Sequence, residues 1–206
     1  MNVRHPPGRG GRLWLEHRLA VATSGADLLD RKRRALVQEH RRLRVLARET
    51  QTAWATAAGE AATWVNRAAV IAGDEKLAML ASVHPRADVT IRWRSSMGVA
   101  FASDARVDLG PAPPAVAGGS AASDLAIPAA RRAVEAAVND AVARSALQRI
   151  GAELTLTARR QRALERRWLP ALNAAATRLS ETLDELEREE SVRTLWATRR
   201  TRGSRS

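Results

Sequence analysis

An apolar residue recurs every three or four positions through most of the first third of the chain. Alternating steps of four and three lead from Leu15 to Ile71 through 17 positions, of which 14 are apolar. The composition alone would place an apolar residue at about eight of them. A 3.5-residue repeat kept over this distance is typical of a left-handed coiled coil, and these residues would form about 85 Å of helix. The first third is therefore predicted to be one long helix with a single apolar seam.

The last third of the chain carries a matching seam. Apolar residues follow the same rhythm from Leu147 to Trp168, and they continue beyond Pro170 after one step of four on four. Such a step locally unwinds a supercoil, and proline removes a backbone donor, so a bend is predicted at Pro170. The residues predicted to form the coiled-coil seam are Leu15, Leu19, Leu29, Leu36, Leu43, Trp54, Trp64, Ile71, Leu164, Trp168, Leu172, Leu179, Leu183 and Leu186.

Between the two seams the pattern changes. β-Branched residues alternate through residues 88–94, and with the residues that follow they predict a short β-hairpin at about 88–101. Prolines, glycines and small residues predict a flexible linker at about 110–125. The expected organisation is a basic arm at 1–11, a coiled-coil helix at 12–72, an insert at 73–125, a second coiled-coil helix at 126–200 and a basic tail at 201–206.

The predicted fold class is mainly α: a long antiparallel two-helix coiled coil, or helical hairpin, with a small insert that contains a short β-hairpin. Two long seams joined by one insert cover each other when the chain folds back, which brings both termini to the same end. A parallel homodimer would cover the same seams, and the periodicity leaves this alternative open. The chain has six tryptophans, one phenylalanine and no tyrosine, and this small bulk favours thin helix-on-helix packing over a thick core.

Several classes of chemistry lack the residues that they need. Without cysteine, the chain has no disulfide, thiol nucleophile or cysteine-ligated zinc. The glycines near the N-terminus do not form a phosphate loop. No apolar run approaches the roughly 20 residues of a membrane helix, and no signal peptide is present. We therefore expect a soluble, intracellular protein without catalytic residues or a cofactor. We also expect no metal site, because metal-ligand spacing is missing from His5, His17, His40 and His84.

The charge of the chain is strongly positive and unevenly distributed. The formal net charge is +12, which suggests an acidic partner such as nucleic acid, anionic lipid or an acidic protein surface. Residues 1–48 are mostly basic, whereas Glu181 to Glu190 is an acidic block that could face the basic N-terminal helix. Two solvated faces are the alternative interpretation. The arginines near the C-terminus could form a nucleic-acid arm, a solubilising tail or a basic tip held by another protein.

Particular segments resemble the D subunit of the V-type and A/V-type rotary ATPases. The N-terminal helix contains Arg-Leu-Trp-Leu at 12–15 and Lys-Arg-Arg-Ala-Leu at 32–36, and the insert contains Met-Gly-Val at 97–99. The C-terminal helix contains Arg-Arg-Gln-Arg-Ala-Leu-Glu at 159–165, Pro170, and the run from Leu183 to Glu190. Departures from the family pattern occur at Asp30, Arg162 and Ser191-Val192, and the linker is longer than is typical.

The resemblance implies a non-catalytic central rotor shaft. Such a shaft transmits torque between the nucleotide-binding head and the membrane ion-translocating ring, for ATP synthesis or ATP-driven ion transport. Its implied partners are the A and B subunits of the head, the F subunit of the stalk and a socket protein above the ring. The location would be cytoplasmic and peripheral to the membrane, without direct membrane insertion. The residues expected to contact the head are Arg4, Arg9, Arg12, Arg193, Arg199 and Arg200.

A second hypothesis is a basic coiled-coil protein that binds nucleic acid through its arginine-rich surfaces. Nucleic acid is not a partner in the rotor interpretation, so measuring nucleic-acid binding distinguishes the two hypotheses. Binding through phosphate contacts weakens steeply as the salt concentration rises, with a slope set by the number of phosphates contacted.

Overall fold

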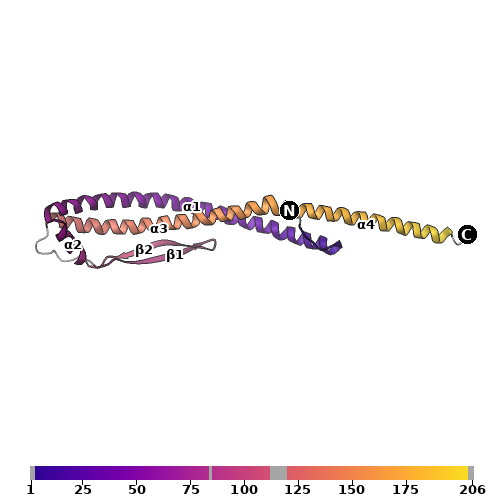
Figure 1. Ribbon diagram of the computed structural model, residues 1–206, viewed down its shortest axis with the longest axis horizontal. Coiled ribbons are helices and arrows are strands. Elements are labelled where there is room, and N and C mark those ends of the chain that lie inside the picture. The colour runs from indigo at the N-terminus through magenta and orange to yellow at the C-terminus, as the bar shows by residue number, and fades with distance from the viewer. Residues whose placement is uncertain (1–2, 84, 112–119, 204–206) are drawn as a thin grey trace. The chain divides into compact units, whose positions relative to one another are not determined.

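The computed structural model describes residues 3–83, 85–111 and 120–203 (Figure 1). Helix α1 spans Gly8–Ala72, α2 spans Asp74–Val83, and the strands β1 and β2 span Asp88–Ser96 and Val99–Asp108. Helix α3 spans Ala121–Ala163 and is followed by a π-helical turn, η1, at Leu164–Trp168 and by α4 at Leu169–Gly203. The chain forms two compact units: unit 1 consists of Met1–Arg33 and Leu156–Ser206, and unit 2 of Arg34–Thr155.

Unit 1 is an antiparallel pair of helical segments. Its core cluster joins Leu15 of α1 to Leu172, Ala175 and Leu179 of α4, with Leu19 and Leu183 partly buried against it. At one end of the pair, Arg9 Nη2 lies 3.1 Å from Glu187 Oε1. Farther along α1, Asp30 Oδ1 accepts a hydrogen bond of 3.3 Å from Gln161 Nε2. Increasing numbers on α1 therefore face decreasing numbers on its partner, as the antiparallel hairpin predicts.

Unit 2 repeats this arrangement and adds the insert. Leu36 and Leu43 of α1 pack with Ala146 and Ile150 of α3, and Phe101 of β2 completes the cluster. Nearer the end of α1, Glu60 Oε1 lies 2.6 Å from Arg132 Nη2. Close to the chain reversal, Ala68 packs against Ala122 and Ala126. The predicted mainly α fold, an antiparallel helical hairpin with a small β-hairpin insert, is confirmed.

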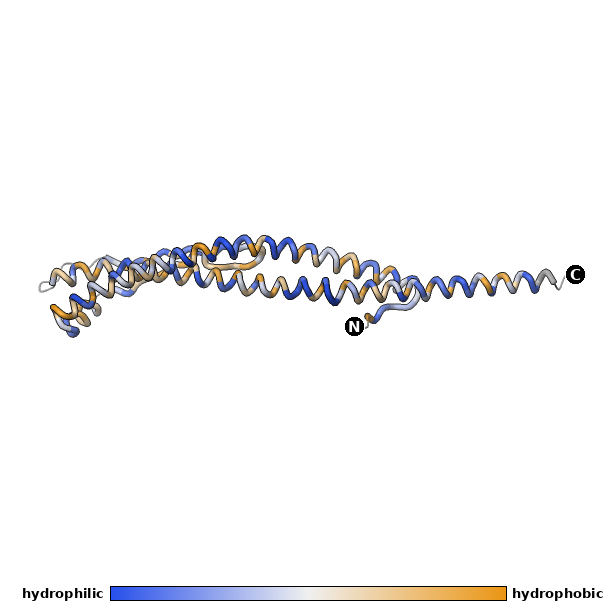
Figure 2. Tube along the Cα trace, turned by 90° about the horizontal axis from the view of Figure 1, so that it is seen from above, coloured by the Kyte–Doolittle hydropathy of each residue, from blue (hydrophilic) through white to orange (hydrophobic). Residues whose placement is uncertain are grey.

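The cores of both units are thin because alanine supplies many of the buried positions. Buried alanines recur along the paired helices, including Ala26 and Ala175 in unit 1 and Ala47, Ala68 and Ala146 in unit 2. Small side chains allow close approach of two helices but remove little apolar area from water. Figure 2 accordingly shows hydrophobic positions distributed along the helices between hydrophilic ones.

The β-hairpin is longer than predicted. The two strands are antiparallel, with Asp88 opposite Asp108 and Ser96 opposite Val99, and the register shifts between Arg92 and Trp93. The turn lies at Met97 and Gly98, whose φ angles of 51° and 79° are both positive. Two-residue hairpin turns require such angles. After this turn the second strand extends to Asp108, beyond the expected end of the hairpin at residue 101.

Several boundaries also differ from the expectation. Helix α1 begins at Gly8, inside the predicted arm, and α3 begins at Ala121, inside the predicted linker. Helix α2 was not predicted at all. It begins after Gly73, whose φ of 84° ends α1, and its first turn carries two acidic residues, which suit a helix N-terminus. Met1 and Asn2, His84, linker residues 112–119 and tail residues 204–206 lie outside the described residues.

The step of four on four in the second seam coincides with η1. In this turn the N–H of Leu169 bonds the carbonyl of Leu164, five residues earlier instead of four. A π turn takes up one extra residue, so the seam passes from Leu164 to Leu172 in eight residues while the helix continues through Pro170. The bend at Pro170 stays a prediction.

Candidate protein-binding surface

The predicted seam residues fall into three groups. Those that are buried are Leu15, Leu36, Leu43, Leu172 and Leu179. Those that are half-buried are Leu19, Leu29, Trp64, Leu164 and Leu183. Those that lie at the surface, contrary to the expectation of a buried seam, are Trp54, Ile71, Trp168 and Leu186.

Local structure explains the surface positions. The narrow alanine-rich seam cannot accommodate Trp54, whose ring instead lies 5.8 Å from the guanidinium carbon of Arg144. Ile71 is in the last turn of α1, and Trp168 is in η1, where no residue is buried. Leu186 lies beyond Leu183, the last α4 residue that packs against the core of unit 1.

The six arginines that were expected to contact the head do not converge in one place. Arg4, Arg9 and Arg12 lie at or before the start of α1, where Arg9 pairs with Glu187 and Arg12 pairs with Glu16 at 3.0 Å. Arg193, Arg199 and Arg200 lie farther along α4. Since Arg199 follows Glu187 by twelve residues, about 18 Å of helix separates it from the Arg9 contact. The structure therefore separates an N-terminal group from a C-terminal group.

The C-terminal group lies on a segment that extends past its helical partner. This segment, Arg188–Gly203, is called the C-terminal arm and covers about 24 Å of helix. No core cluster of the described residues contains a side chain of the arm, and its residues up to Arg200 are all exposed. The arm is thus a helical segment whose side chains lie outside the core clusters of the described residues.

One face of the arm is apolar. Val192, Leu195 and Trp196 are 51%, 59% and 69% exposed, and Arg199 follows on the same face. Their spacing of i, i+3, i+4 and i+7 is the anchor pattern of a helix that binds in the groove of a partner protein. Three large apolar side chains with an arginine form a surface that would fit an apolar groove of a partner protein with polar groups at its rim.

The arm keeps its helical form through local interactions. Arg193 pairs with Glu189 at 3.2 Å, and Arg188 pairs with Glu185 at 3.0 Å. Such exposed pairs contribute a few tenths of a kcal/mol each, and a single helix of this length is marginal in water. Binding by another protein would therefore both cover the apolar face and stabilise the helix.

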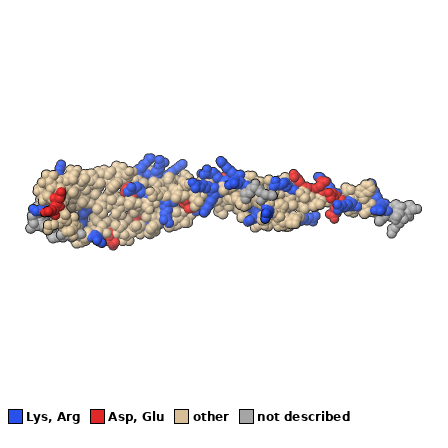
Figure 3. All heavy atoms as spheres, viewed as in Figure 1, with Lys and Arg blue, Asp and Glu red and all other residues tan. Residues whose placement is uncertain are grey.

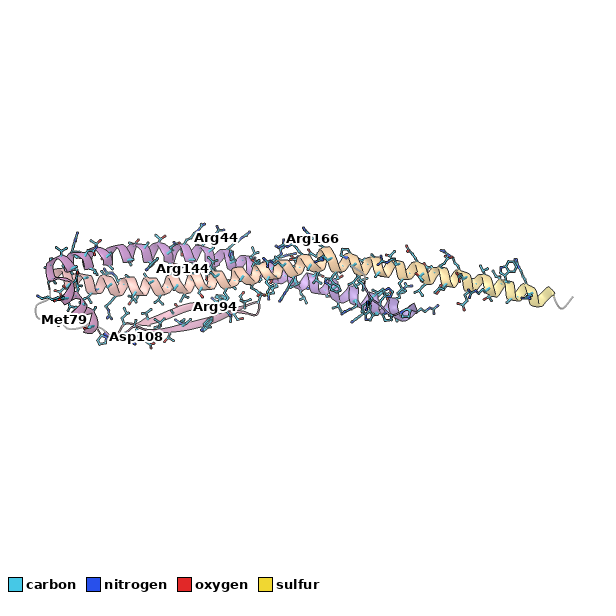
Figure 4. All side chains as sticks on the ribbon, in the orientation of Figure 1. Arg44, Met79, Arg94, Asp108, Arg144 and Arg166 are labelled. Carbon is cyan, nitrogen blue, oxygen red and sulfur yellow. The ribbon has the colours of Figure 1, made fainter. Side chains whose placement is uncertain are left out.

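Unit 2 has a second apolar surface close to the chain reversal. Val70 and Ile71 near the end of α1 are strongly exposed, as is Met79 of α2, which Figure 4 labels. A groove of about 420 Å³ in the same unit is lined mainly by apolar residues such as Leu77 and Ile127. Arg131 borders the groove and donates hydrogen bonds to the carbonyls of Leu109 and Gly110, at 3.1 and 2.6 Å. Exposed apolar side chains of this kind are suited to contact with another protein.

In the part of the chain that the structure describes, no three histidine, aspartate or glutamate residues lie close enough together to hold a metal ion. No helix in this part of the chain is sufficiently long and apolar to span a membrane. Glu39 raises the pKa of Arg42 by accepting its hydrogen bonds, so this side chain keeps its charge. The surfaces described above can bind other molecules, and both are suited to proteins.

Sequence reasoning missed the apolar face of the arm and the apolar surface of unit 2. Val192 and Leu195 were not among the predicted residues, although their spacing with Trp196 was visible in the sequence. The signal was that helical apolar spacing continues in α4 beyond the residues that pair with the start of α1. The surface around Met79 depends on α2, which the sequence reasoning did not predict.

Comparison with known proteins gives consistent matches over nearly the whole chain. The family model for the ATP synthase D subunit matches residues 13–199. The D subunit of a V-type ATP synthase from Anaeromyxobacter dehalogenans (strain 2CP-C) is 34% identical over 196 residues, covering 90% of this chain and 91% of that protein. The D subunit of an A-type ATP synthase from Thermococcus kodakarensis is 30% identical over 198 residues, covering 94% and 92%. The D subunit of a V-type ATP synthase from Thermotoga neapolitana is 30% identical over 190 residues, covering 91% and 93%.

Proposed function

The chain belongs to the family of ATP synthase D subunits, and from this we propose that it is the central rotor shaft of a V/A-type rotary ATPase. In this role it transmits torque between the nucleotide-binding head and the ion-translocating ring in the membrane. The protein itself carries out no catalytic step. It is a cytoplasmic component, peripheral to the membrane, within a membrane-bound complex.

The C-terminal arm is the observation that carries this proposal. A single helix with Val192, Leu195 and Trp196 exposed on one face needs a partner that surrounds it. A ring of A and B subunits would be such a partner, because the arm would occupy the centre of the ring and be surrounded by these subunits. Arg193, Arg199 and Arg200 on the same segment would contact the polar groups of the ring. Arg4, Arg9 and Arg12 would form a separate contact nearer to the start of α1.

Unit 2 supplies the attachment to the other components of the complex. The apolar surface around Val70 and Met79 suits insertion into the socket protein above the membrane ring. The paired helices of unit 2 would provide the contact for the F subunit. A shaft transmits torque only when one part of the chain holds the head and another part holds the ring. The two units would therefore bind different partners.

The test is a reciprocal binding experiment with two double variants of the full chain. In Leu195→Ala/Trp196→Ala the arm loses its largest apolar side chains, and in Val70→Ala/Met79→Ala unit 2 loses two exposed ones. Purified A and B subunits are titrated with each variant, and the socket protein is titrated in parallel. Each variant is the control for the other, because all four side chains are exposed and their removal leaves the cores intact.

We expect the arm variant to bind the head at least tenfold more weakly than the wild type while it binds the socket normally, since Trp and Leu anchors dominate helix-in-groove interfaces. The unit 2 variant should show the reverse pattern. If the arm variant joins the head as tightly as the wild type does, the proposed placement of the arm is wrong.

A further inference from the structure

Five arginines gather around η1 in unit 1. Arg159, Arg160 and Arg162 are in the last turns of α3, and Arg166 and Arg167 are in η1 itself. All five are exposed, and the stretch from Arg159 to Arg167 contains one acidic residue, Glu165. These five residues are called the arginine cluster. Figure 3 shows basic side chains gathered in patches along the surface, and Figure 4 labels Arg166.

The side chains of the arginine cluster have no carboxylate partner among the described residues. No side-chain hydrogen bond or ion pair is formed there by Arg159, Arg160, Arg166 or Arg167, and the side chain of Arg162 donates only to the carbonyl of Ala158, at 3.2 Å. Six other helical arginines pair with an acid three or four residues away, namely Arg12–Glu16, Arg33–Asp30, Arg42–Glu39, Arg144–Asp140, Arg188–Glu185 and Arg193–Glu189, whereas others, such as Arg41 and Arg44, have no such partner among the described residues either.

The single acid in the cluster is engaged elsewhere. Glu165 Oε1 accepts a hydrogen bond of 2.8 Å from Gln161 Nε2, and the same nitrogen lies 3.3 Å from Asp30 Oδ1 on α1. Asp30 in turn accepts a hydrogen bond from Arg33 at 3.1 Å. A polar network that joins the two helices of unit 1 therefore includes Glu165 and Asp30, and neither carboxylate forms an ion pair with the five arginines.

The spacing of the arginines concentrates their charge. Arg159, Arg162 and Arg166 occur at i, i+3 and i+7, so they lie on one face of the helix and repel one another. The π turn contains Arg166 and Arg167, and π turns inside helices are frequent at functional sites. Trp168 directly follows and is 41% exposed. Arginine and tryptophan are the residue types most enriched at the energetic centres of protein interfaces.

On its C-terminal side the positive stretch of the helix ends abruptly. Residues 168–177 carry no charged side chain, and the block from Glu181 to Glu190 is strongly acidic. A nucleic-acid backbone would continue past these residues and would meet the acidic block, which repels phosphate. A short protein segment that carries several carboxylates fits the available length, and the planar guanidinium group binds carboxylates in a bidentate manner.

We propose that the arginine cluster is a docking surface for an acidic segment of a partner protein, whose aspartate and glutamate side chains neutralise the five arginines. This inference rests on the proposed function, because the acidic segment is assigned to a protein that surrounds unit 1 in the assembled complex. The cluster thus adds an electrostatic contact to the apolar contact of the C-terminal arm.

The first test uses the isolated full chain and two probes, fluorescein-labelled poly-L-glutamate and a labelled oligothymidylate of 20 nucleotides. The variant Arg159→Gln/Arg162→Gln/Arg166→Gln removes three unpaired arginines. The matched control, Arg42→Gln/Arg92→Gln/Arg132→Gln, removes the same charge from exposed arginines that already have carboxylate partners. We expect the cluster variant to bind poly-L-glutamate at least about tenfold more weakly and the control to remain within about twofold.

The unfolding temperature provides a check on folding. Because the cluster variant relieves repulsion between like charges, its unfolding temperature should equal or exceed that of the wild type. Equal losses of poly-L-glutamate binding in the two triple variants would overturn the proposal, since net charge alone would then explain them. Loss of oligothymidylate binding with poly-L-glutamate binding retained would instead assign the cluster to nucleic acid.

The second test uses the chain assembled with the A and B subunits. The cluster variant should dissociate from the head at a lower salt concentration than the control variant does. If the wild type does not assemble at all, the proposed function is wrong, although the poly-L-glutamate result still stands. If the wild type assembles and both variants respond alike to salt, the docking proposal is wrong and the proposed function is retained.

Discussion

At the scale of single residues, polar groups in the thin seams are accommodated by specific neighbours. Asp140 is fully buried in unit 2, where its carboxylate lies 2.7 Å from Arg144 Nη2 and Thr50 Oγ1 approaches it at 3.5 Å. His40 lies beside Gly151, at which an added Cβ would be 3.4 Å from the imidazole Nε2. A small residue on one helix therefore provides the space for a larger polar residue on the other.

Two of the glycines of α1 in unit 1, Gly25 and Gly11, predict opposite effects of the same substitution. Gly25→Ala should raise the free energy of unfolding by about 0.5–1 kcal/mol, because alanine favours the helix and the new Cβ would meet Leu164 Cδ1 at an ordinary 3.8 Å. Gly11→Ala should not stabilise the protein, because its Cβ would lie 1.9 Å from the carbonyl oxygen of Pro6. Urea unfolding measures both values.

Hydrogen exchange of the segment before α1 provides the control for this comparison. Gly11→Ala should increase exchange in the backbone near Pro6, whereas Gly25→Ala should leave it unchanged. Equal stabilisation by both substitutions would show that the N-terminal segment does not pack against α1 as described.

Which residues face each other across a seam could not be predicted from the sequence. The steps of three and four identified one face of each long helix. They gave no alignment between the two helices, so the pairing of Asp140 with Thr50 was missed. For the same reason the sequence could not show that Asp30, a departure from the family pattern, joins Arg33 to Gln161.

At the scale of elements, Phe101 is the largest side chain that attaches the β-hairpin to the helices. Phe101 is 2% exposed and lies in the core cluster with Leu36, Leu43 and Ile150, and Val99 is partly buried beside it. On the first strand, Trp93 is 60% exposed. A two-stranded hairpin is marginally stable by itself, so its order depends on the contact of Phe101 with the helices.

Phe101→Ala should lower the free energy of unfolding by about 3–5 kcal/mol and release the hairpin from the helices. Trp93→Ala, in the same hairpin, should change the free energy of unfolding by less than about 0.5 kcal/mol. Hydrogen exchange should rise across residues 88–108 in the first variant and remain unchanged in the second. A hairpin that stays protected in Phe101→Ala would contradict the proposed anchor.

The elements that sequence reasoning missed are those without a periodic signal. The long helices were predicted because their seams extend over many turns. Helix α2 has ten residues, too few for a clear repeat, and its position depends on Gly73, whose positive φ is not visible in the sequence. The position of the hairpin turn at Met97-Gly98 was not predicted, and a methionine with positive φ is unusual. The π turn was indicated by the step of four on four but was interpreted as a stutter.

At the scale of the whole molecule, the chain divides its binding surfaces between two units. Unit 1 contains the C-terminal arm and the arginine cluster, and unit 2 contains the apolar surface around Val70 and Met79. This distribution and membership of the family of ATP synthase D subunits both support a protein that connects other proteins. We propose that the chain, by connecting the head to the membrane ring, transmits rotation between them.

Single-molecule rotation tests this claim most directly. Because the chain has no cysteine, Met79→Cys on exposed α2 provides one attachment point for a bead, and the A and B subunits are fixed to the surface. With ATP, the bead should rotate continuously in one direction, and the rotation should stop when ATP is removed. A bead that stays stationary while the fixed head hydrolyses ATP would contradict the account.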